Sequence, residues 1–405
     1  MNADTFAALL TPTGRAALAQ LAHADLDEAH TLPLLTALRR TLPPDVAGAA
    51  LTLARLRQRA TRKFSRAAEM FFTPDALEQA SGEQIAAWRA RRFAALQPAR
   101  LADLGCGVGG DTLALAALEG CTVYALDRDA LRLRMASENL AVYGRHAHLL
   151  QADLRHPLPL RDVEAAFFDP ARRREGRRVF SVRAYLPPLD VLRDWDFHAW
   201  GVKLSPGVRL DELRTYCAQG AGVEFISLAG ALKEAVLWGG ALGFSGRRAT
   251  RISPDGRAET LHPAELPPLP LSEPRAVLYE PDPAVIRAGL LSEMAAQLGD
   301  PLWRLDGQIA YLTGDRHIPT PWARAWPILE WLPFNLKRLR AALRARGVGR
   351  VTVKKRGSPL TPEGLLRKLK LSGAGTEAVV VLTQVNGRHS ALICGLPLRA
   401  LDGAQ

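Results

Sequence analysis

Apolar and polar positions alternate along this chain with two different periods. Residues 1 to about 60 are rich in Ala and Leu at helical spacing, with interruptions at Pro33 and Pro43-Pro44, which predicts two or three helices. Thr73-Pro74 predicts the start of a further helix, and Ser81 with Gln84 predicts a capping box for the next one. A helical segment is therefore expected before the first strand.

From Arg100 to about Phe244, short apolar strands alternate with helical stretches. Five strands are predicted in ARLADLG, TVYALD, AHLLQAD, VEAAFFDP and WGVKLSP, with helices at 111–118, 128–143 and 187–195. This alternation predicts a mostly parallel sheet with helices on both faces. The segments AGVEFISLAG and KEAVLWGGAL are expected to close the sheet as antiparallel end strands.

A second unit follows a Pro-rich stretch, LHPAELPPLPL, at 261–271. Before it, Pro254-Asp255-Gly256 predicts a hairpin, and after it residues 281–298 predict a helix. Residues 333–347 and 361–371 predict basic helices around a strand at 349–357, and Asn386-Gly387 predicts a two-residue hairpin turn. The expected regions are 1–70, 71–245, 246–330 and 331–405, of which the last is a small α/β module.

Composition adds a charge asymmetry to an otherwise ordinary globular chain. The 405 residues include 48% hydrophobic and 23% charged residues, which excludes a wholly disordered chain. The net charge of +12 is concentrated after Trp331, where 14 Lys and Arg stand against Glu363, Glu377 and Asp402, a net of +11. A second basic cluster comprises Arg55, Arg57, Arg59, Arg62, Lys63 and Arg66. Such surfaces suit a polyanion, although a solvated basic surface would have the same composition.

The remaining composition indicates a protein of the cytoplasm. Its four cysteines, Cys106, Cys121, Cys217 and Cys394, are scattered without metal-ligand spacing, so no metal site is expected. The N-terminus lacks the pattern of a signal peptide, and no apolar run approaches the ~18 residues of a membrane span. The oligomeric state cannot be predicted from these features.

The segment DLGCGVGGD at 103–111 suggests a site for S-adenosylmethionine (SAM). Gly105, Gly107 and Gly109 follow the first strand, where they let the backbone approach a ligand. Asp127 ends the second strand, where its carboxylate is placed to accept hydrogen bonds from both ribose hydroxyls. Asp153 ends the third strand and is expected to hold the adenine amino group.

The same glycines permit a competing interpretation, because Gly105, Gly107 and Gly110 also satisfy the G-x-G-x-x-G pattern of nicotinamide enzymes. Asp103 argues against it. A dinucleotide would place a pyrophosphate at this turn, which Asp103 would repel, whereas SAM brings the ammonium of its methionine part. A glycine-rich turn without any ligand is the remaining alternative.

The fourth strand ends in FFDPARRR, at the position where methyl transfer is expected. Asp169 and Pro170 stand where amino methyltransferases carry Asn or Asp followed by Pro-Pro and an aromatic residue. There, a side-chain oxygen and a backbone carbonyl orient an exocyclic amine. Arg172 replaces the aromatic residue and is available to stack on a base or to grip a phosphate, as are Arg173 and Arg174. Phe180 and Tyr185 are candidate replacement stackers, and the alternative is a buried strand end with a solvated Arg loop.

Several segments together resemble a bacterial family of class I SAM-dependent methyltransferases with a C-terminal THUMP-like domain. The resemblance rests on FFTPDALEQAS, AAWRARRF, DLGCGVGGD, FFDPARR, LKEAVLW and VTVKKRGSPLTPEGLLRKLK. It implies a Rossmann-like α/β sheet with a helical N-terminal segment and a THUMP-like module. The chain also resembles, more weakly, the guanine-N2 trimethylguanosine synthases, whose aromatic residue after the proline pair is absent here.

The resemblance implies two further sets of functional residues. Lid helices within 73–95 would cover the cofactor, with Gln79 and Arg89 as candidate contacts. The C-terminal module would bind RNA, and its phosphate-contact candidates are Lys354, Lys355, Arg356, Arg367, Lys368 and Lys370.

The sequence thus predicts an enzyme that methylates a nucleotide in structured RNA, such as a tRNA or rRNA. Two alternatives remain at this stage. One is a methyltransferase for a small molecule or a protein, and the other is a non-catalytic RNA-binding protein that keeps SAM as a structural ligand.

Overall fold

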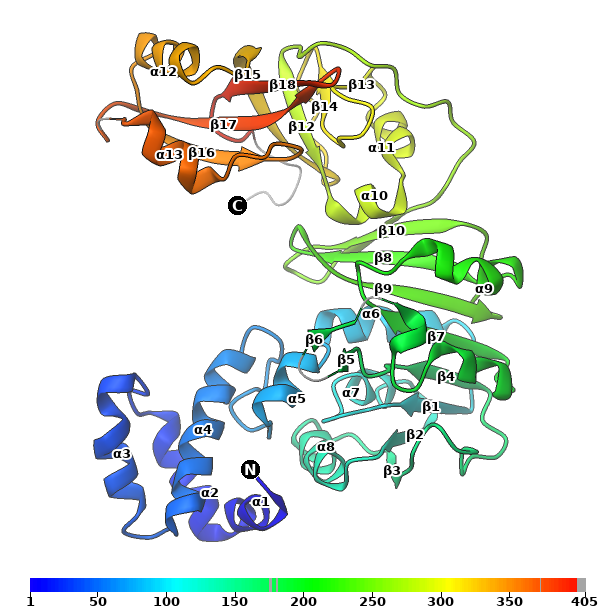
Figure 1. Ribbon diagram of the computed structural model, residues 1–405. Helices are drawn as coiled ribbons and strands as arrows, with labels where there is room; N and C mark the ends of the chain where they lie inside the picture. Colours follow the sequence, from blue (N-terminus) through cyan, green and yellow to red (C-terminus); the bar gives the residue numbers. More distant parts are fainter. Residues whose placement is uncertain (175–176, 180, 372, 399–405) are drawn as a thin grey trace. The chain divides into compact units, whose positions relative to one another are not determined.

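A computed structural model describes residues 1–174, 177–179, 181–371 and 373–398. The chain forms two compact units (Figure 1). The first comprises Met1–Gly222 and Ala235–Ser245, and the second comprises Val223–Glu234 and Gly246–Gln405. The candidate cofactor residues belong to the first unit and the candidate RNA-binding residues to the second.

Residues 1–60, all of which are described, fold into four α-helices and one 3-10 turn. Local caps explain most of the starts: Asn2 forms a capping box, Thr11 caps the second helix, and Pro12 and Pro44 occupy first helical positions. The elements are α1 (Ala3–Leu10), α2 (Pro12–Ala22), η1 (Glu28–His30), α3 (Thr31–Leu38) and α4 (Pro44–Ala60).

The sheet of the first unit has the predicted parallel centre. Its strand order is β9-β7-β4-β1-β2-β3, in which β4, β1, β2, β3 and β7 run parallel and Ala235–Gly240 of β9 runs antiparallel to β7. The strands are β1 (Arg100–Leu104), β2 (Thr122–Asp127), β3 (His148–Gln151), β4 (Ala165–Phe168), β7 (Ala199–Leu204) and β9 (Ala231–Gly240).

Helices precede and connect these strands, together with a short hairpin. The α-helices are α5 (Pro74–Gln79), α6 (Glu83–Ala94), α7 (Thr112–Leu115), α8 (Ala130–Val142) and α9 (Arg214–Ala218). The 3-10 turns are η2 (Val182–Ala184), η3 (Leu189–Asp194) and η4 (Leu210–Leu213), and the hairpin pairs β5 (Arg173–Arg174) with β6 (Arg177–Arg178). The helices predicted at 111–118 and 187–195 are therefore a single α-helical turn and a 3-10 segment.

The capping box predicted at Ser81 is wrong. Gly82 is the N-cap of α6 and makes no side-chain cap hydrogen bond. The Ser81 hydroxyl instead accepts a hydrogen bond from Lys203, at 2.9 Å. A long-range polar contact has replaced the local one that the sequence suggested.

The N-terminal helices share a hydrophobic core with the sheet unit. Phe6 of α1 is fully buried and packs edge-on against Phe71, with ring centroids 5.4 Å apart. The same cluster includes Val108 of the glycine loop and Met135 of α8. Residues 1–60 are thus joined to the first unit through a continuous core.

The second unit begins with a small group of strands. Strand β10 (Arg247–Ile252) pairs in parallel with β8 (Gly222–Leu228) and antiparallel with β11 (Ala258–Leu261), across the predicted turn at 254–256. Helix α10 (Pro283–Ala288) packs on β10. The predicted helix 281–298 is divided, because Gly289 adopts a left-handed conformation that ends α10 before α11 (Leu291–Leu298).

A seven-stranded sheet forms the rest of this unit, in the order β13-β14-β12-β15-β18-β17-β16. It draws on the region 246–330 as well as on the C-terminal region. The predicted hairpin is present, because Asn386 and Gly387 both have positive φ between β17 and β18. The strands are β12 (Val277–Pro281), β13 (Trp303–Arg304), β14 (Leu312–Gly314), β15 (Ala323–Pro333), β16 (Val348–Lys355), β17 (Thr376–Val385) and β18 (Arg388–Cys394).

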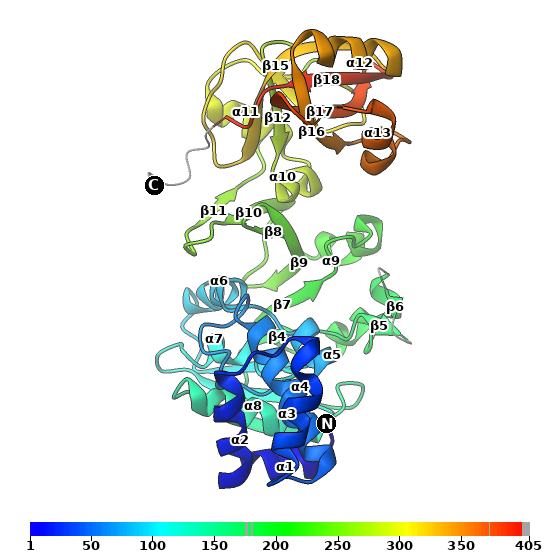
Figure 2. The same cartoon turned by 90° about the vertical axis from the view of Figure 1, so that its left-hand side faces the viewer.

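Two helices cover one face of this sheet, namely α12 (Leu336–Ala345) and α13 (Pro362–Leu369), as Figure 2 shows. Val380 and Leu382 pack under these helices, whereas Val379 and Val381 belong to a second core on the opposite face. Over the described part of the chain, the helices are too short or too polar to cross a lipid bilayer.

Candidate functional site

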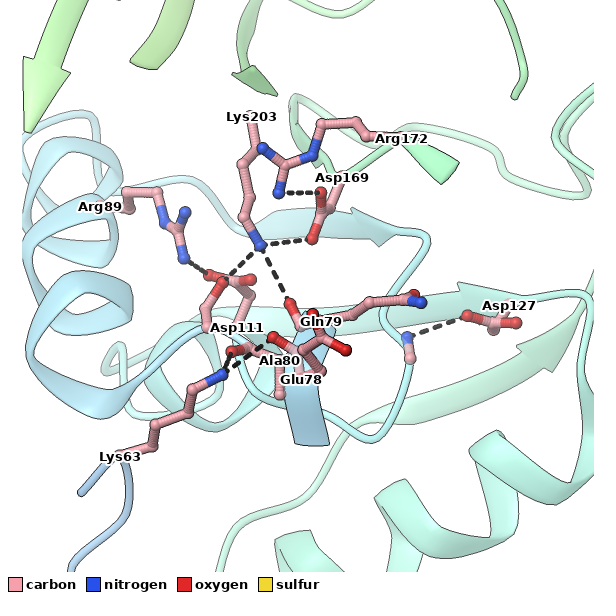
Figure 3. A network of polar contacts seen from close by, with 12 residues as sticks. Lys63, Glu78, Gln79, Ala80, Arg89, Asp111, Asp127, Asp169, Arg172 and Lys203 are labelled. Carbon is pink, nitrogen blue, oxygen red and sulfur yellow. Dashed lines mark hydrogen bonds and ion pairs between the residues drawn. The ribbon is translucent and has the colours of Figure 1, made fainter. Parts of the chain in front are cut away.

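The carboxyl ends of neighbouring parallel strands bring three carboxylates to one edge of the first sheet. Strand β1 lies between β4 and β2, so Asp103 near the end of β1 is flanked by Asp169 after β4 and Asp127 at the end of β2. Open α/β sheets bind ligands at this edge. Figure 3 shows the network of polar contacts at this edge of the sheet.

The glycine loop after β1 makes two close approaches that larger residues would block. Gly105 has φ +85°, and a Cβ built on it would lie 2.6 Å from the carbonyl oxygen of Asp169. A Cβ on Gly110 would lie 3.0 Å from the carbonyl oxygen of Ser81, in the loop between α5 and α6. Gly107 and Gly109 also have positive φ, of 57° and 86°. The loop therefore fits tightly between the end of β4 and the predicted lid.

Asp103 is a buried carboxylate with one unsatisfied oxygen. Its Oδ2 accepts a hydrogen bond of 2.6 Å from the Thr112 hydroxyl, while its Oδ1 has no hydrogen-bond partner among the described residues. Burial, followed by the neighbouring carboxylates of Asp111 and Asp169, raises the pKa of Asp103 to about 8. A carboxylate in this state lacks a cation, which the ammonium of SAM would supply. The residues present therefore fit that cofactor.

Asp127 is held in a fixed orientation by backbone groups. Its Oδ2 accepts from the Gly107 N–H and its Oδ1 from the Asp129 N–H, both at 2.9 Å. Because each carboxylate oxygen can accept more than one hydrogen bond, the pair remains suitable for two ribose hydroxyls. That role for Asp127 stays a prediction.

Asp153 lies after β3 and is engaged by a neighbour two residues away. Both carboxylate oxygens accept from the Arg155 guanidinium, with Nε at 3.0 Å from each. This interaction holds the pKa of Asp153 well below its usual range. The predicted contact with the adenine amino group would therefore be made by a firmly ionised carboxylate, and it remains untested.

The predicted lid is held at two points, one at the end of the glycine loop and one at the segment that follows α4. Arg89 of α6 is 1% exposed, pairs with Asp111 after the loop, and lies 4.6 Å from the ring centroid of Phe167. The Lys63 ammonium donates to the carbonyl oxygens of Leu77, Glu78 and Ala80 at the end of α5. Arg89 thus has an intramolecular partner in this structure, and its predicted cofactor contact is not tested.

Gln79 differs from Arg89 in being exposed. Its side chain extends towards the side of the site where Asp127 lies (Figure 3). Its backbone carbonyl is 3.5 Å from the Lys203 ammonium. This placement is compatible with the predicted cofactor contact.

Lys203, which the sequence prediction missed, contacts Asp169, the predicted catalytic carboxylate. It extends from β7 with its side chain 5% exposed, and its Nζ is 2.6 Å from Oδ2 of Asp169. The signal in the sequence was a single charged residue inside the apolar strand WGVKLSP. A lysine buried in a central strand needs a partner, and that partner is the predicted catalytic carboxylate.

Arg172 also turns towards Asp169, with Nη2 3.9 Å from Oδ1. Pro170 is buried and follows the strand end as predicted. Tyr185 is not a stacking residue, because it is 2% exposed and its hydroxyl accepts a hydrogen bond from the Ser205 N–H. Phe180 and the side chains of Arg173 and Arg174 lie outside the described part of the structure.

The candidate phosphate contacts of the second unit fall into two groups. Arg367, Lys368 and Lys370 are exposed at the C-terminal end of α13. Lys354 instead pairs with Glu280 and lies 4.6 Å from the ring centroid of Trp326, and the Arg356 guanidinium lies 5.4 Å from that of Tyr311. Both aromatic residues belong to the core opposite α12 and α13, so Lys354 and Arg356 do not face the same way as α13. Lys355, between them, is exposed.

Helix α12 adds cations that were not among the predicted contacts, namely the exposed Lys337, Arg338 and Arg344. Arg340 links the two helices, because its guanidinium donates to the carbonyl oxygens of Lys368 and Leu369. The exposed cations of α12 and α13 therefore belong to one rigid helical layer.

Most residues of the second basic cluster form hydrogen bonds or ion pairs within the chain. Arg55 donates to the Leu26 carbonyl and the Thr31 hydroxyl, and Arg57 donates to the carbonyls of Glu69 and Met70. Arg66 pairs with Glu69, and Lys63 caps α5 as described above. Only Arg59 and Arg62 are exposed members for which no partner is described, so the expectation of a polyanion surface here is not supported.

Comparisons with known proteins place these features in context. The family model described as THUMP domain-like matches residues 323–396, and a model for a domain of unknown function matches residues 2–60. Over 318 residues the chain is 38% identical to a Mycobacterium tuberculosis protein named as an uncharacterized S-adenosylmethionine-dependent methyltransferase. The match covers 77% of this chain and 84% of that relative.

A solved structure has the same fold along almost the whole chain. It is that of a putative methyltransferase from Porphyromonas gingivalis, with a TM-score of 0.70 and 18% identity over 99% of this chain and 100% of that one. The predicted fold class, a Rossmann-like sheet with an N-terminal helical segment and a C-terminal THUMP-like module, is thereby confirmed.

Proposed function

Since this chain belongs to the family of S-adenosylmethionine-dependent methyltransferases, we propose that it transfers the methyl group to a nucleotide in structured RNA, such as a tRNA or rRNA. The enzyme class and the cofactor follow from the family. The RNA substrate is the proposed part, and the following features support it.

The main support for RNA is the coincidence of a THUMP-like domain with an exposed basic helical layer. The matched residues 323–396 include α12 and α13, whose exposed cations are Lys337, Arg338, Arg344, Arg367 and Lys368. Exposed Lys and Arg bind the phosphate backbone without reading sequence. These cations would bind the phosphates of a folded RNA, and the first unit would carry out the methyl transfer.

The first unit would hold the cofactor through its own strand-end residues. Bound there, SAM supplies a methyl group on a positively charged sulfur, which a nucleophile attacks. Asp103 Oδ1 would bind the ammonium of the methionine part, and Asp127 would bind the ribose. The glycines at 105, 107 and 109 leave room for close backbone approach, and the loop 80–82 would cover the site and exclude water.

The test is transfer of labelled methyl groups from SAM into total RNA from a strain that lacks this gene. We expect RNase-sensitive label with the wild-type enzyme and none with Asp169→Ala. RNA from the wild-type strain should accept little label, because its sites are already methylated. Label found only in protein or in small molecules would overturn the proposal.

A further inference from the structure

Lys203 joins the predicted catalytic carboxylate to the lid loop, the segment 80–82 between α5 and α6. Its Nζ is 2.6 Å from Asp169 Oδ2 and 2.9 Å from the Ser81 hydroxyl, and the Gln79 carbonyl oxygen is 3.5 Å away (Figure 3). An ammonium has three N–H groups, which these three acceptors can engage. Lys203 is 4% exposed, so the acceptors take the place of water around it. Its ammonium therefore acts on Asp169 and on the lid.

The main chain of Asp169 is fixed by its neighbours, so the orientation of its carboxylate depends on the side chains around it. The Asp169 N–H donates to the Leu104 carbonyl at 2.9 Å, and its own carbonyl oxygen lies against Gly105. Lys203 binds Oδ2, whereas Oδ1 is 3.9 Å from Arg172 Nη2, which is beyond hydrogen-bond distance. Lys203 thus holds one carboxylate oxygen and leaves the other for a substrate.

Ser81 connects the same lysine to the glycine loop. Its hydroxyl accepts from Lys203, and a Cβ on Gly110 would lie 3.0 Å from its carbonyl oxygen. The lid loop therefore lies between the glycine loop, which would approach the cofactor, and the lysine that binds Asp169. Movement of the lid loop away from Gly110 would take the Ser81 hydroxyl away from the Lys203 ammonium.

From these contacts we infer that Lys203 is a positioning residue, which orients Asp169 for methyl transfer and does so fully only when the lid loop lies on the glycine loop. Cofactor binding under the lid would then complete the site for the methyl acceptor. The inference rests on the proposed function for the role of Asp169. It applies whichever atom of the acceptor is methylated.

Reaction rates test the positioning role. Lys203→Met should lower the single-turnover rate on RNA from the deletion strain by about 10²-fold, the loss that a misplacement of about 1 Å causes. Lys203→Arg keeps a cation beside Asp169 and should be faster than Lys203→Met. The exposed Lys233→Met in β9 is the matched control and should keep the wild-type rate. A wild-type rate in Lys203→Met would overturn the inference.

A paired variant tests whether Lys203 acts through Asp169. Asp169→Asn keeps a side-chain oxygen but loses the charge that strengthens the hydrogen bond to Lys203. Lys203→Met should therefore slow the Asp169→Asn enzyme by a smaller factor than it slows the wild type. An equal factor in the two backgrounds would show that Lys203 acts independently of Asp169, and would contradict the positioning role.

Hydrogen exchange tests the connection to the lid without any methyl acceptor. Saturating S-adenosylhomocysteine should slow amide exchange in residues 77–82 of the wild type. Lys203→Met and Ser81→Ala should each weaken that protection, because each removes the hydrogen bond between the lid loop and the ammonium. Wild-type protection in either variant, or no protection in the wild type, would overturn the lid connection.

Binding of S-adenosylhomocysteine shows which variants are folded. If Lys203→Met does not bind it, Ser81→Ala, which leaves the ion pair with Asp169 intact, decides the lid connection, and Lys203→Arg, set against the wild type, decides the effect on the rate. If the wild-type enzyme transfers no label to RNA, the proposed function is wrong. The exchange comparison then still decides whether Lys203 and the lid are connected.

Discussion

The protonation state of the buried Asp103 depends on whether a cation lies beside it. Its pKa of about 8 in the folded protein means that it is largely protonated at neutral pH until a cation arrives. The same shift makes the fold less stable as pH rises from about 4 towards 8, because ionisation becomes costly over that range. A ligand ammonium favours the ionised form of Asp103 over the protonated form, since it pairs only with the ionised carboxylate.

Cofactor binding should therefore release a proton from Asp103. Between pH 6 and 7.5, affinity for S-adenosylhomocysteine should rise by up to about tenfold per pH unit. Calorimetric titrations in buffers of different ionisation enthalpy measure the release. Asp103→Asn should lose both the proton release and about 10- to 100-fold in affinity. A pH-independent affinity in the wild type would show that Asp103 does not meet the ligand ammonium.

At the scale of residues, the sequence predicted side chains that stand at the ends of parallel strands. It did not predict contacts between residues that are far apart in the chain. Asp103, Asp127 and Asp169 lie at one edge of the sheet as predicted, because parallel strands end there, and their roles stay predictions. Lys203 and its contact with Ser81 were missed, because the two residues are 122 positions apart and only the fold brings them together. The internal hydrogen bonds of the basic cluster at 55–66 could not be predicted for the same reason, since its carbonyl acceptors lie on other elements.

At the scale of elements, patterns with strong local signals were predicted well. The strands β1 to β4, the helix α8 and the hairpin at Asn386-Gly387 all lie where their periodicity and turn residues indicated. The helix at 281–298 was predicted as one piece, because its apolar spacing continues through Gly289. Gly289 adopts a left-handed conformation that ends α10, and the apolar spacing alone does not show that break.

Helix α13 should carry a measurable share of RNA binding. Arg367→Glu with Lys368→Glu removes two exposed cations and should lower the slope of log affinity against log salt by about 1.4 to 1.8. The control is Arg39→Glu with Arg40→Glu, which changes the charge equally at the end of α3 and is also exposed. Filter binding across a salt series measures the slope of log affinity against log salt for both double variants. Equal slopes for the α13 variant and the wild type would exclude α13 from the interface.

At the scale of the whole molecule, the chain combines a catalytic unit with a unit that contains the THUMP-like domain. The N-terminal helices belong to the catalytic unit, because Phe6, Phe71 and Met135 share one core. The sheet of the second unit includes strands from residue 277 onwards. It therefore begins well before the basic region that follows Trp331. Long-range strand pairing of this kind leaves little trace in local periodicity, which explains why composition suggested a smaller module.

The site at the strand ends is the central claim, and cofactor binding tests it most directly. The measurement is calorimetric titration of the full chain with S-adenosylhomocysteine, comparing wild type with Asp127→Ala and with the exposed Asp45→Ala as control. We predict one binding site in the wild type and in the control, and an affinity about 10- to 100-fold lower in Asp127→Ala, which loses charged hydrogen bonds to the ribose. Equal affinities in all three proteins would contradict the assignment of the cofactor to this site.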